Sequence, residues 1–223
     1  MSKVKLLAYT HIYPHNRDYP ESLMNAQDFI AFCARVSNPD NQNNNKTAPK
    51  LLKYLMDNKH WSPFEMASVT MEIETTRDIA RQILRHRSFS FQEFSQRYAD
   101  PTKMEFVTRE ARLQDTKNRQ NSIQTDDKTL QGTWKVIQDT YIDQAKVDYQ
   151  WAIDHGIAKE VARSILPEGL TNSRLYMAGT LRSWIHYCQL RTKNGTQKEH
   201  MEIAEMCWKE LKLIYPFLAE IEI

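Results

Sequence analysis

The 223-residue sequence has little glycine and almost no excess of charge of either sign. Its five glycines form neither GxGxxG nor GxxxxGK[ST], so the two common glycine-rich phosphate loops are absent. Thirty Lys and Arg residues against 28 Asp and Glu residues give a formal net charge of +2. A protein that neutralises many nucleic-acid phosphates needs a larger basic excess, so we expect no nucleic-acid partner.

Cysteine is also scarce, and long apolar runs are missing. The three cysteines, Cys33, Cys188 and Cys207, form no CxxC pair, which is typical of a reducing compartment. No stretch approaches the roughly 18 apolar residues of a membrane span, and the first residues are too short an apolar run for a signal peptide. With 8 Phe, 10 Tyr and 5 Trp residues available for a core, we expect a folded cytoplasmic protein.

The hydrophobic pattern predicts one domain of strands and helices. Alternation of Val69, Met71 and Ile73 with polar residues predicts a strand with one buried face. Residues 173–181 fit either a strand or the start of a helix, and residues 108–127 are expected to form an exposed excursion. Strands are predicted at 3–12 and 67–74, a polar loop at 38–46, and helices at 21–37, 47–58, 76–87, 130–163 with a break at 155–156, 181–191 and 196–213.

The densest group of binding side chains lies between residues 77 and 98. Arg77, Arg81 and Arg85 recur every four residues, so on a helix they share one face, where like charges repel. A bound anion would relieve that repulsion, because Arg suits bidentate contact with phosphate. Spacing alone favours a solvated basic helix end that complements the helix dipole.

Two other classes of protein stay open at this point. A nucleic-acid or phosphate-binding module could use these arginines together with Arg87, although the net charge of +2 argues against it. A metal hydrolase is a weaker hypothesis, because the seven histidines form no HExxH and no Cys/His ligand spacing. We therefore expect no bound metal.

Residues 85–98 resemble the signature of the flavin-dependent thymidylate synthases, approximately RHRxxSxNExSxRY. Position 92 is Gln where Asn is common, and the last His of a second motif is Met66 here. Near position 200 the family's AQxEIR is matched by Gln197 and Glu199 but not by His200. The signature is matched by Arg85, His86, Arg87, Ser90, Glu93, Ser95, Arg97 and Tyr98, and further ordered matches lie at 34–37, 60–65, 160–167 and 181–191.

This resemblance implies an α/β (α+β) fold, a single domain over residues 1–223 with a mostly antiparallel or mixed sheet flanked by helices. It also implies a homotetramer whose active sites are shared between subunits. The implied reaction is reductive methylation of dUMP to dTMP, with methylenetetrahydrofolate as carbon donor, FAD as hydride carrier and NADPH as reductant. A related flavin- and folate-dependent change at C5, such as hydroxymethylation, stays open because the same ligands would be bound.

The resemblance also implies roles for individual residues. Arg191 is expected to stabilise charge on the pyrimidine oxygens, and Ser95 is a conceivable nucleophile without a marked base. His60 and Tyr98 are candidates for the folate side of the flavin. The expected FAD contacts are Ser37, Ser62, Arg85, His86, Arg87, Arg182 and His186. The expected dUMP contacts are Gln82, Glu93, Ser95, Arg97, Tyr98, Arg163 and Arg191.

Plainer roles remain open for several of these side chains. Arg163 precedes a Leu-Pro turn and would serve equally as a helix cap, and His60 could simply end the preceding helix. Arg182 and His186 are also consistent with a polar stripe on a core helix. Glu65 is as well suited to pairing with an Arg as to holding a ligand.

Overall fold

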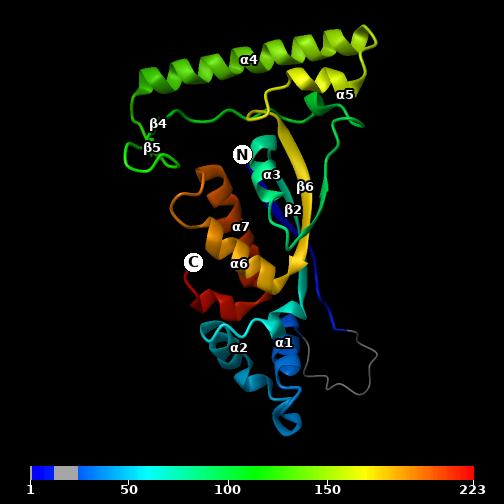
Figure 1. Ribbon diagram of the computed structural model, residues 1–223, viewed down its shortest axis with the longest axis vertical. Coiled ribbons are helices and arrows are strands. Elements are labelled where there is room, and N and C mark those ends of the chain that lie inside the picture. Colours follow the sequence, from blue (N-terminus) through cyan, green and yellow to red (C-terminus); the bar gives the residue numbers. More distant parts are fainter. Residues whose placement is uncertain (1, 13–24) are drawn as a thin grey trace.

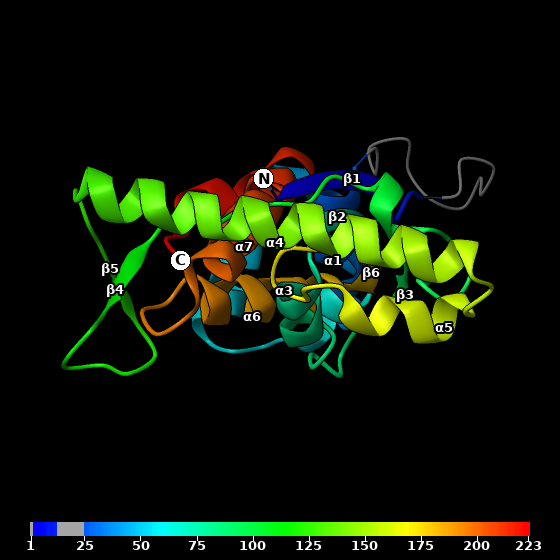
Figure 2. The ribbon, with the colours of Figure 1, turned by 90° about the horizontal axis from the view of Figure 1, so that it is seen from above.

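The structure is a computed structural model that describes residues 2–12 and 25–223. Four strands form one sheet in the order β1-β2-β6-β3, and each neighbouring pair is antiparallel. A separate two-stranded hairpin, β4–β5, projects at one end of the molecule (Figure 2). The strands are β1 Lys3–Tyr9, β2 Ser68–Thr76, β3 Ser90–Glu93, β4 Arg112–Gln114, β5 Ser122–Gln124 and β6 Asn172–Thr180.

The sheet has one apolar and one charged face, as the alternation in β2 predicts. Met71 lies opposite Met177 and Ile73 opposite Leu175, and all four side chains are buried. On the other face Arg174 pairs with Glu74 of the neighbouring strand. Side chains of a strand point alternately to its two sides, so a single apolar face is available to helices.

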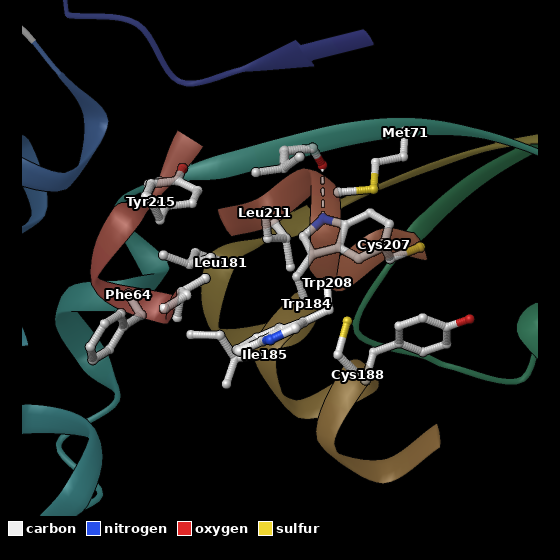
Figure 3. Packing of buried hydrophobic residues seen from close by; sticks show 14 of the residues in the cluster. Phe64, Met71, Leu181, Trp184, Ile185, Cys188, Cys207, Trp208, Leu211 and Tyr215 are labelled. Atoms are coloured by element: carbon white, nitrogen blue, oxygen red, sulfur yellow. Dashed lines mark hydrogen bonds between the residues drawn. The ribbon is translucent and has the colours of Figure 1, made fainter. Parts of the chain in front are cut away.

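Three helices cover that apolar face: α3 (Arg77–Ile83), α6 (Leu181–Arg191) and α7 (Lys198–Ile214) (Figure 1). Trp184 of α6 is fully buried at the centre of the core shown in Figure 3. Its indole Nε1–H donates to the carbonyl oxygen of Val69 over 3.0 Å, which satisfies the one polar group of the ring. This hydrogen bond therefore links α6 directly to β2 within the core.

Two pairs of helices lie at opposite ends of the molecule (Figure 1). At one end are α1 (Ala26–Ala34) and α2 (Ala48–Asp57), and at the other are α4 (Lys128–Asp154) and α5 (Lys159–Ala162). α4 leaves large side chains in solvent, with Tyr141 67% and Trp151 57% exposed. No helix within residues 2–12 and 25–223 has the length and apolar character that a bilayer crossing requires.

Most predicted elements are present. The strand over 67–74, the helices over 47–58 and 181–191 and the long helical region with its break are confirmed, and Gly156 ends α4 with a φ of 78°. The undecided stretch 173–181 is strand. The predicted helix over 21–37 is observed from Ala26 to Ala34, and its first four positions lie outside the described residues.

Two predicted element boundaries were wrong, and one strand was not predicted. The helix predicted over 76–87 ends at Ile83, because the next residues turn so that His86 contacts α6. Strand β3 was missed, since four residues at a sheet edge carry little periodic signal. The N-terminal strand stops at Tyr9, short of residue 12. The excursion over 108–127 forms the β4–β5 hairpin, and it does contribute one buried residue, Ala111.

Candidate active site

A contact between His86 and Arg191 joins segments 105 residues apart in the sequence. Arg191 ends α6, and its Nε–H donates to Nε2 of His86 over 2.9 Å. The His86 ring stands edge-on to the ring of Tyr187, with 4.9 Å between the two centroids. Because Nε2 accepts a hydrogen bond, the neutral imidazole carries its own proton on Nδ1.

The surroundings of His86 keep it uncharged near neutral pH. Burial, then the charge of Arg191, then His186 lower the pKa of His86 to about 4. The guanidinium group of Arg191 supplies a positive charge and planar N–H donors. This junction therefore combines a permanent cation with a neutral aromatic ring, a pairing suited to holding an anionic, planar ligand.

A cavity of about 410 Å³ lies between the turn Ser62–Glu65 and the start of α6. Arg182 Nη1 donates to Glu65 Oε1 over 2.5 Å, and Thr180 Oγ1 donates to Glu65 Oε2 over 3.0 Å. The hydrogen bond from Arg182 is the main reason that the pKa of Glu65 lies below its usual value. The cavity is lined by Trp61, Glu65, Ser88, Thr180, Arg182, Ser183, His186 and Gln189.

The arginine face of α3 is balanced by carboxylates of the chain itself. Arg81 Nη1 lies 3.1 Å from Glu93 Oε2, and Arg77 Nη1 lies 3.9 Å from Glu93 Oε1. Glu168 Oε1 lies within 3.6 Å of both guanidinium groups. Arg85 is outside this arrangement, because α3 ends at Ile83. The repulsion expected from the spacing is thus offset without a bound anion.

The chain is similar to a known protein family along most of its length. The model of a protein family described as thymidylate synthase complementing protein matches residues 21–217. The chain belongs to this family. The resemblance to the flavin-dependent thymidylate synthases is thereby confirmed, and so is the mixed α/β fold with an antiparallel sheet.

Several known proteins are similar to this chain over most of their length. A probable flavin-dependent thymidylate synthase of Paramecium bursaria Chlorella virus 1 is 50% identical over 90% of this chain and 92% of the relative. A flavin-dependent thymidylate synthase of Synechocystis sp. is 49% identical over 88% of this chain and 89% of the relative. The crystal structure of a UMP/dUMP methylase, PolB, of Streptomyces cacaoi with 5-Br dUMP has a TM-score of 0.81 at 26% identity, covering 99% of this chain and 93% of that one.

Some of the residues expected to contact flavin lie at the cavity or at the His86–Arg191 junction, and others do not. Arg182 and His186 line the cavity together. The segment that carries exposed Arg85 and Arg87 reaches the same cavity at Ser88, whose carbonyl oxygen accepts from Ser183 Oγ over 3.3 Å. Ser37 and Ser62 are exposed; Ser62 begins the turn beside the cavity, whereas Ser37 follows α1.

The residues expected to contact dUMP form two groups. Gln82, Glu93 and Arg191 lie on or next to the helices that cover the sheet. A second group surrounds Glu160 of α5: Arg97 Nη2 lies 3.2 Å from its carboxylate, and Arg163 Nε donates to its backbone carbonyl oxygen over 3.4 Å. Within residues 2–12 and 25–223, no hydrogen bond or ion pair joins this second group to His86 or Arg191.

The remaining candidates are on the surface. Ser95 and His60 are exposed, and Tyr98 is 87% exposed, its carbonyl oxygen accepting from Lys159. The His60 ring contacts that of Tyr54 edge-on, with centroids 6.4 Å apart. These three side chains present hydrogen-bonding groups and aromatic rings to solvent.

The plainer roles weighed from the sequence have mixed outcomes. Glu65 does pair with Arg182, and Arg163 does bond the end of a short helix. Arg182 and His186 are exposed polar positions on a helix that is otherwise mostly buried, and both also line the cavity. Sequence reasoning missed five lining residues, although each lies in or beside a matched motif: Trp61, Ser88, Thr180, Ser183 and Gln189.

The buried cysteines are poorly suited to act as nucleophiles at this site. Cys188 is fully buried, and burial raises its pKa well above the usual value, so the thiol stays protonated. Burial likewise raises the pKa of Cys207. In the parts of the chain that the structure describes, no three His, Cys, Asp or Glu side chains converge on a possible metal position.

Proposed function

We propose that this chain methylates dUMP at C5 to give dTMP, with methylenetetrahydrofolate as carbon donor, FAD as hydride carrier and NADPH as reductant. The observation that carries the proposal is the 2.9 Å contact between His86 and Arg191, which unites two of the matched motifs. The names of the relatives support the substrate and the flavin, as does the methylase neighbour solved with a dUMP analogue.

The chemistry of the cavity fits a flavin. Trp61 offers an aromatic surface, and Arg182 offers a cationic donor, while Thr180, Ser183 and Gln189 offer neutral hydrogen-bonding groups. We assign Arg85, Arg87 and Arg182 to the flavin diphosphate, with His86, His186, Ser37 and Ser62 as further contacts. The bound flavin would supply the hydride, and the protein would bind and orient the flavin and dUMP and polarise the reacting atoms.

On the dUMP side, Arg191 has the role closest to the chemistry. Its Nε–H donates to His86, which orients the guanidinium and leaves the terminal nitrogens available to a ligand. There a permanent positive charge stabilises negative charge that develops on the pyrimidine oxygens. We assign Gln82, Glu93, Ser95, Arg97, Tyr98 and Arg163 to further dUMP contacts, and His60 with Tyr98 to the folate side.

A homotetramer would complete this site. Among the described residues, no hydrogen bond or ion pair joins the group near α5 to Arg191, so we propose that one subunit supplies that group and another supplies Arg191. The exposed aromatic side chains of α4, next to α5, favour a second copy of the chain as their cover.

The visible absorption spectrum tests the proposal. Purified protein is recorded alone, with FAD and then with dUMP, and we expect flavin bands that travel with the protein and shift on addition of dUMP. The product formed from dUMP with methylenetetrahydrofolate and NADPH is then identified by mass spectrometry. UMP is tested as a substrate in a parallel reaction. A one-carbon gain as methyl supports the proposal, a hydroxymethyl product replaces it with the related reaction, and absence of bound flavin refutes it.

A further inference from the structure

A chain of hydrogen bonds runs through Gln82 from buried Tyr187 to half-buried Glu199. Tyr187 OH lies 3.1 Å from Nε2 of His200, and Nδ1 of His200 lies 3.2 Å from Oε1 of Gln82. Nε2 of Gln82 donates to Oε1 of Gln197 over 2.8 Å, and Nε2 of Gln197 donates to Oε2 of Glu199 over 3.0 Å. Each of the four bonds joins a different pair of side chains, so the five residues form one continuous line.

The chemistry of these groups gives the line a single direction. A carbonyl oxygen cannot donate, so Nδ1 of His200 must carry the proton that bonds to Gln82. Burial, then the charge of Arg191, then His86 lower the pKa of His200 to about 3, so the ring is neutral and its Nε2 accepts from Tyr187. Burial also raises the pKa of Tyr187 well above its usual value, which keeps the phenol protonated. Every bond therefore donates toward Glu199.

The line ends on a fixed anion. Glu199 Oε1 accepts from Arg112 Nη2 over 2.6 Å, and Arg112 begins the β4–β5 hairpin. Asn121 in the same hairpin donates to Asn194, just before α7, over 2.7 Å. The hairpin, to which the sequence assigned no role, thus holds the carboxylate that terminates the line.

We propose that Gln197 and His200 are positioning residues that hold the Gln82 amide in one orientation, leaving its second Nε2–H to donate to an oxygen of the substrate. The proposal rests on the proposed function, in which Gln82 contacts dUMP. The two ends of a glutamine amide have nearly the same shape, so packing alone does not choose between them. If the Gln82 amide were flipped, its NH₂ would face the Nδ1–H of His200 and its oxygen would face the side-chain oxygen of Gln197. Both contacts are unfavourable, so these two neighbours determine the orientation of the amide.

The direction can be measured in the unmodified protein. Solid-state ¹⁵N NMR of histidine-labelled protein reports which ring nitrogen carries the proton, and the His200 signals are identified by their loss in His200→Gln. We expect the proton on Nδ1. A proton on Nε2 overturns the proposal, whether or not the protein binds dUMP.

A charge swap tests the effect on the substrate. In Gln197→Glu the new carboxylate has no proton to donate to Glu199, and repulsion between the two negative charges moves the acceptor of the Gln82 amide away. We expect dUMP affinity to fall by about tenfold while FAD occupancy stays unchanged. In the double variant Gln197→Glu/Glu199→Gln, the amide introduced at position 199 donates back to the carboxylate introduced at position 197. That carboxylate still accepts from Gln82. We expect the double variant to recover to within about threefold of the original dUMP affinity.

The matched control is Asn25→Asp, because Asn25 also donates to a carboxylate, that of Asp28, but on the surface at the start of α1. It should bind dUMP like the original protein. Equal dUMP affinity in Gln197→Glu and the original protein, or no recovery in the double variant, overturns the positioning role. If the original protein binds no dUMP, the proposed function fails, and the NMR experiment still decides the orientation.

Discussion

Mild acid should destabilise this protein through His200. The ring is fully buried and neutral, with a pKa of about 3 against an ordinary value of 6.5 in the unfolded chain. Because the folded state resists protonation, the histidine's contribution is complete above about pH 6.5 and is lost as the pH falls toward about 3. Between about pH 7 and pH 5, linkage gives a loss of about 2 kcal/mol in the free energy of unfolding from this one group.

Urea unfolding followed by tryptophan fluorescence measures this loss. With a urea dependence of about 2 kcal/mol per molar, the midpoint should fall by about 1 M between about pH 7 and pH 5. His86, whose pKa is lowered to about 4, acts in the same direction. The pKa values of Glu65 and Glu199 lie below the ordinary carboxyl value, so these groups lose their contribution at lower pH than this window.

Two variants separate His200 from other acid effects. His200→Gln removes the titrating ring but keeps a donor and an acceptor, so its midpoint should depend less on pH. His155→Gln changes an exposed histidine that directly follows α4 and should retain the full pH dependence. If the original protein and His200→Gln lose stability in parallel, the assignment of the loss to His200 is wrong.

Further substitutions test the core and the site. Trp184→Phe removes the donor to Val69 and leaves a void, so the free energy of unfolding should fall by about 2–3 kcal/mol in urea titrations. Gly179→Ala places a Cβ 2.5 Å from the Phe89 ring, so stability should fall by about 1–3 kcal/mol, and Phe89→Leu in the same chain should restore part of it. Arg191→Ala should lower dUMP-dependent turnover on the order of 100-fold with flavin retained, and an unchanged rate would count against its substrate role. Arg87→Ala should lose flavin first, measured as the ratio of flavin to protein absorbance; full occupancy would contradict that assignment.

Sequence periodicity predicted the elements that have one buried face. The alternation of Val69, Met71 and Ile73 marked β2, because each of those side chains enters the core. Periodicity missed β3, where Phe91 is half-buried and the strand is held by its pairing with β6 rather than by a repeating pattern. Local signals describe what a segment buries, whereas an edge strand is defined by its neighbour.

For the site, motifs predicted which segments matter but not how they meet. The contact of His86 with Arg191 depends on where α3 ends and on how α6 packs, which no local pattern encodes. The spacing of Arg77, Arg81 and Arg85 favoured a solvated basic helix end or a bound anion, whereas Glu93 and Glu168 pair with the first two arginines from other parts of the chain. Long-range ion pairs of this kind require tertiary structure to be seen.

The pairing of β2 with β6 has a consequence for the order in which the chain folds. Ser68 lies opposite Thr180, so the two central strands cannot pair until most of the protein has been synthesised. Until then the apolar side of β2 lacks its neighbour, and such non-local pairing slows folding and exposes an open strand edge to aggregation. Thr180 both ends β6 and caps α6, so the same late event brings Arg182 and Arg191 into place. A nascent chain that stops before β6 therefore lacks both the centre of its sheet and the wall of its cavity.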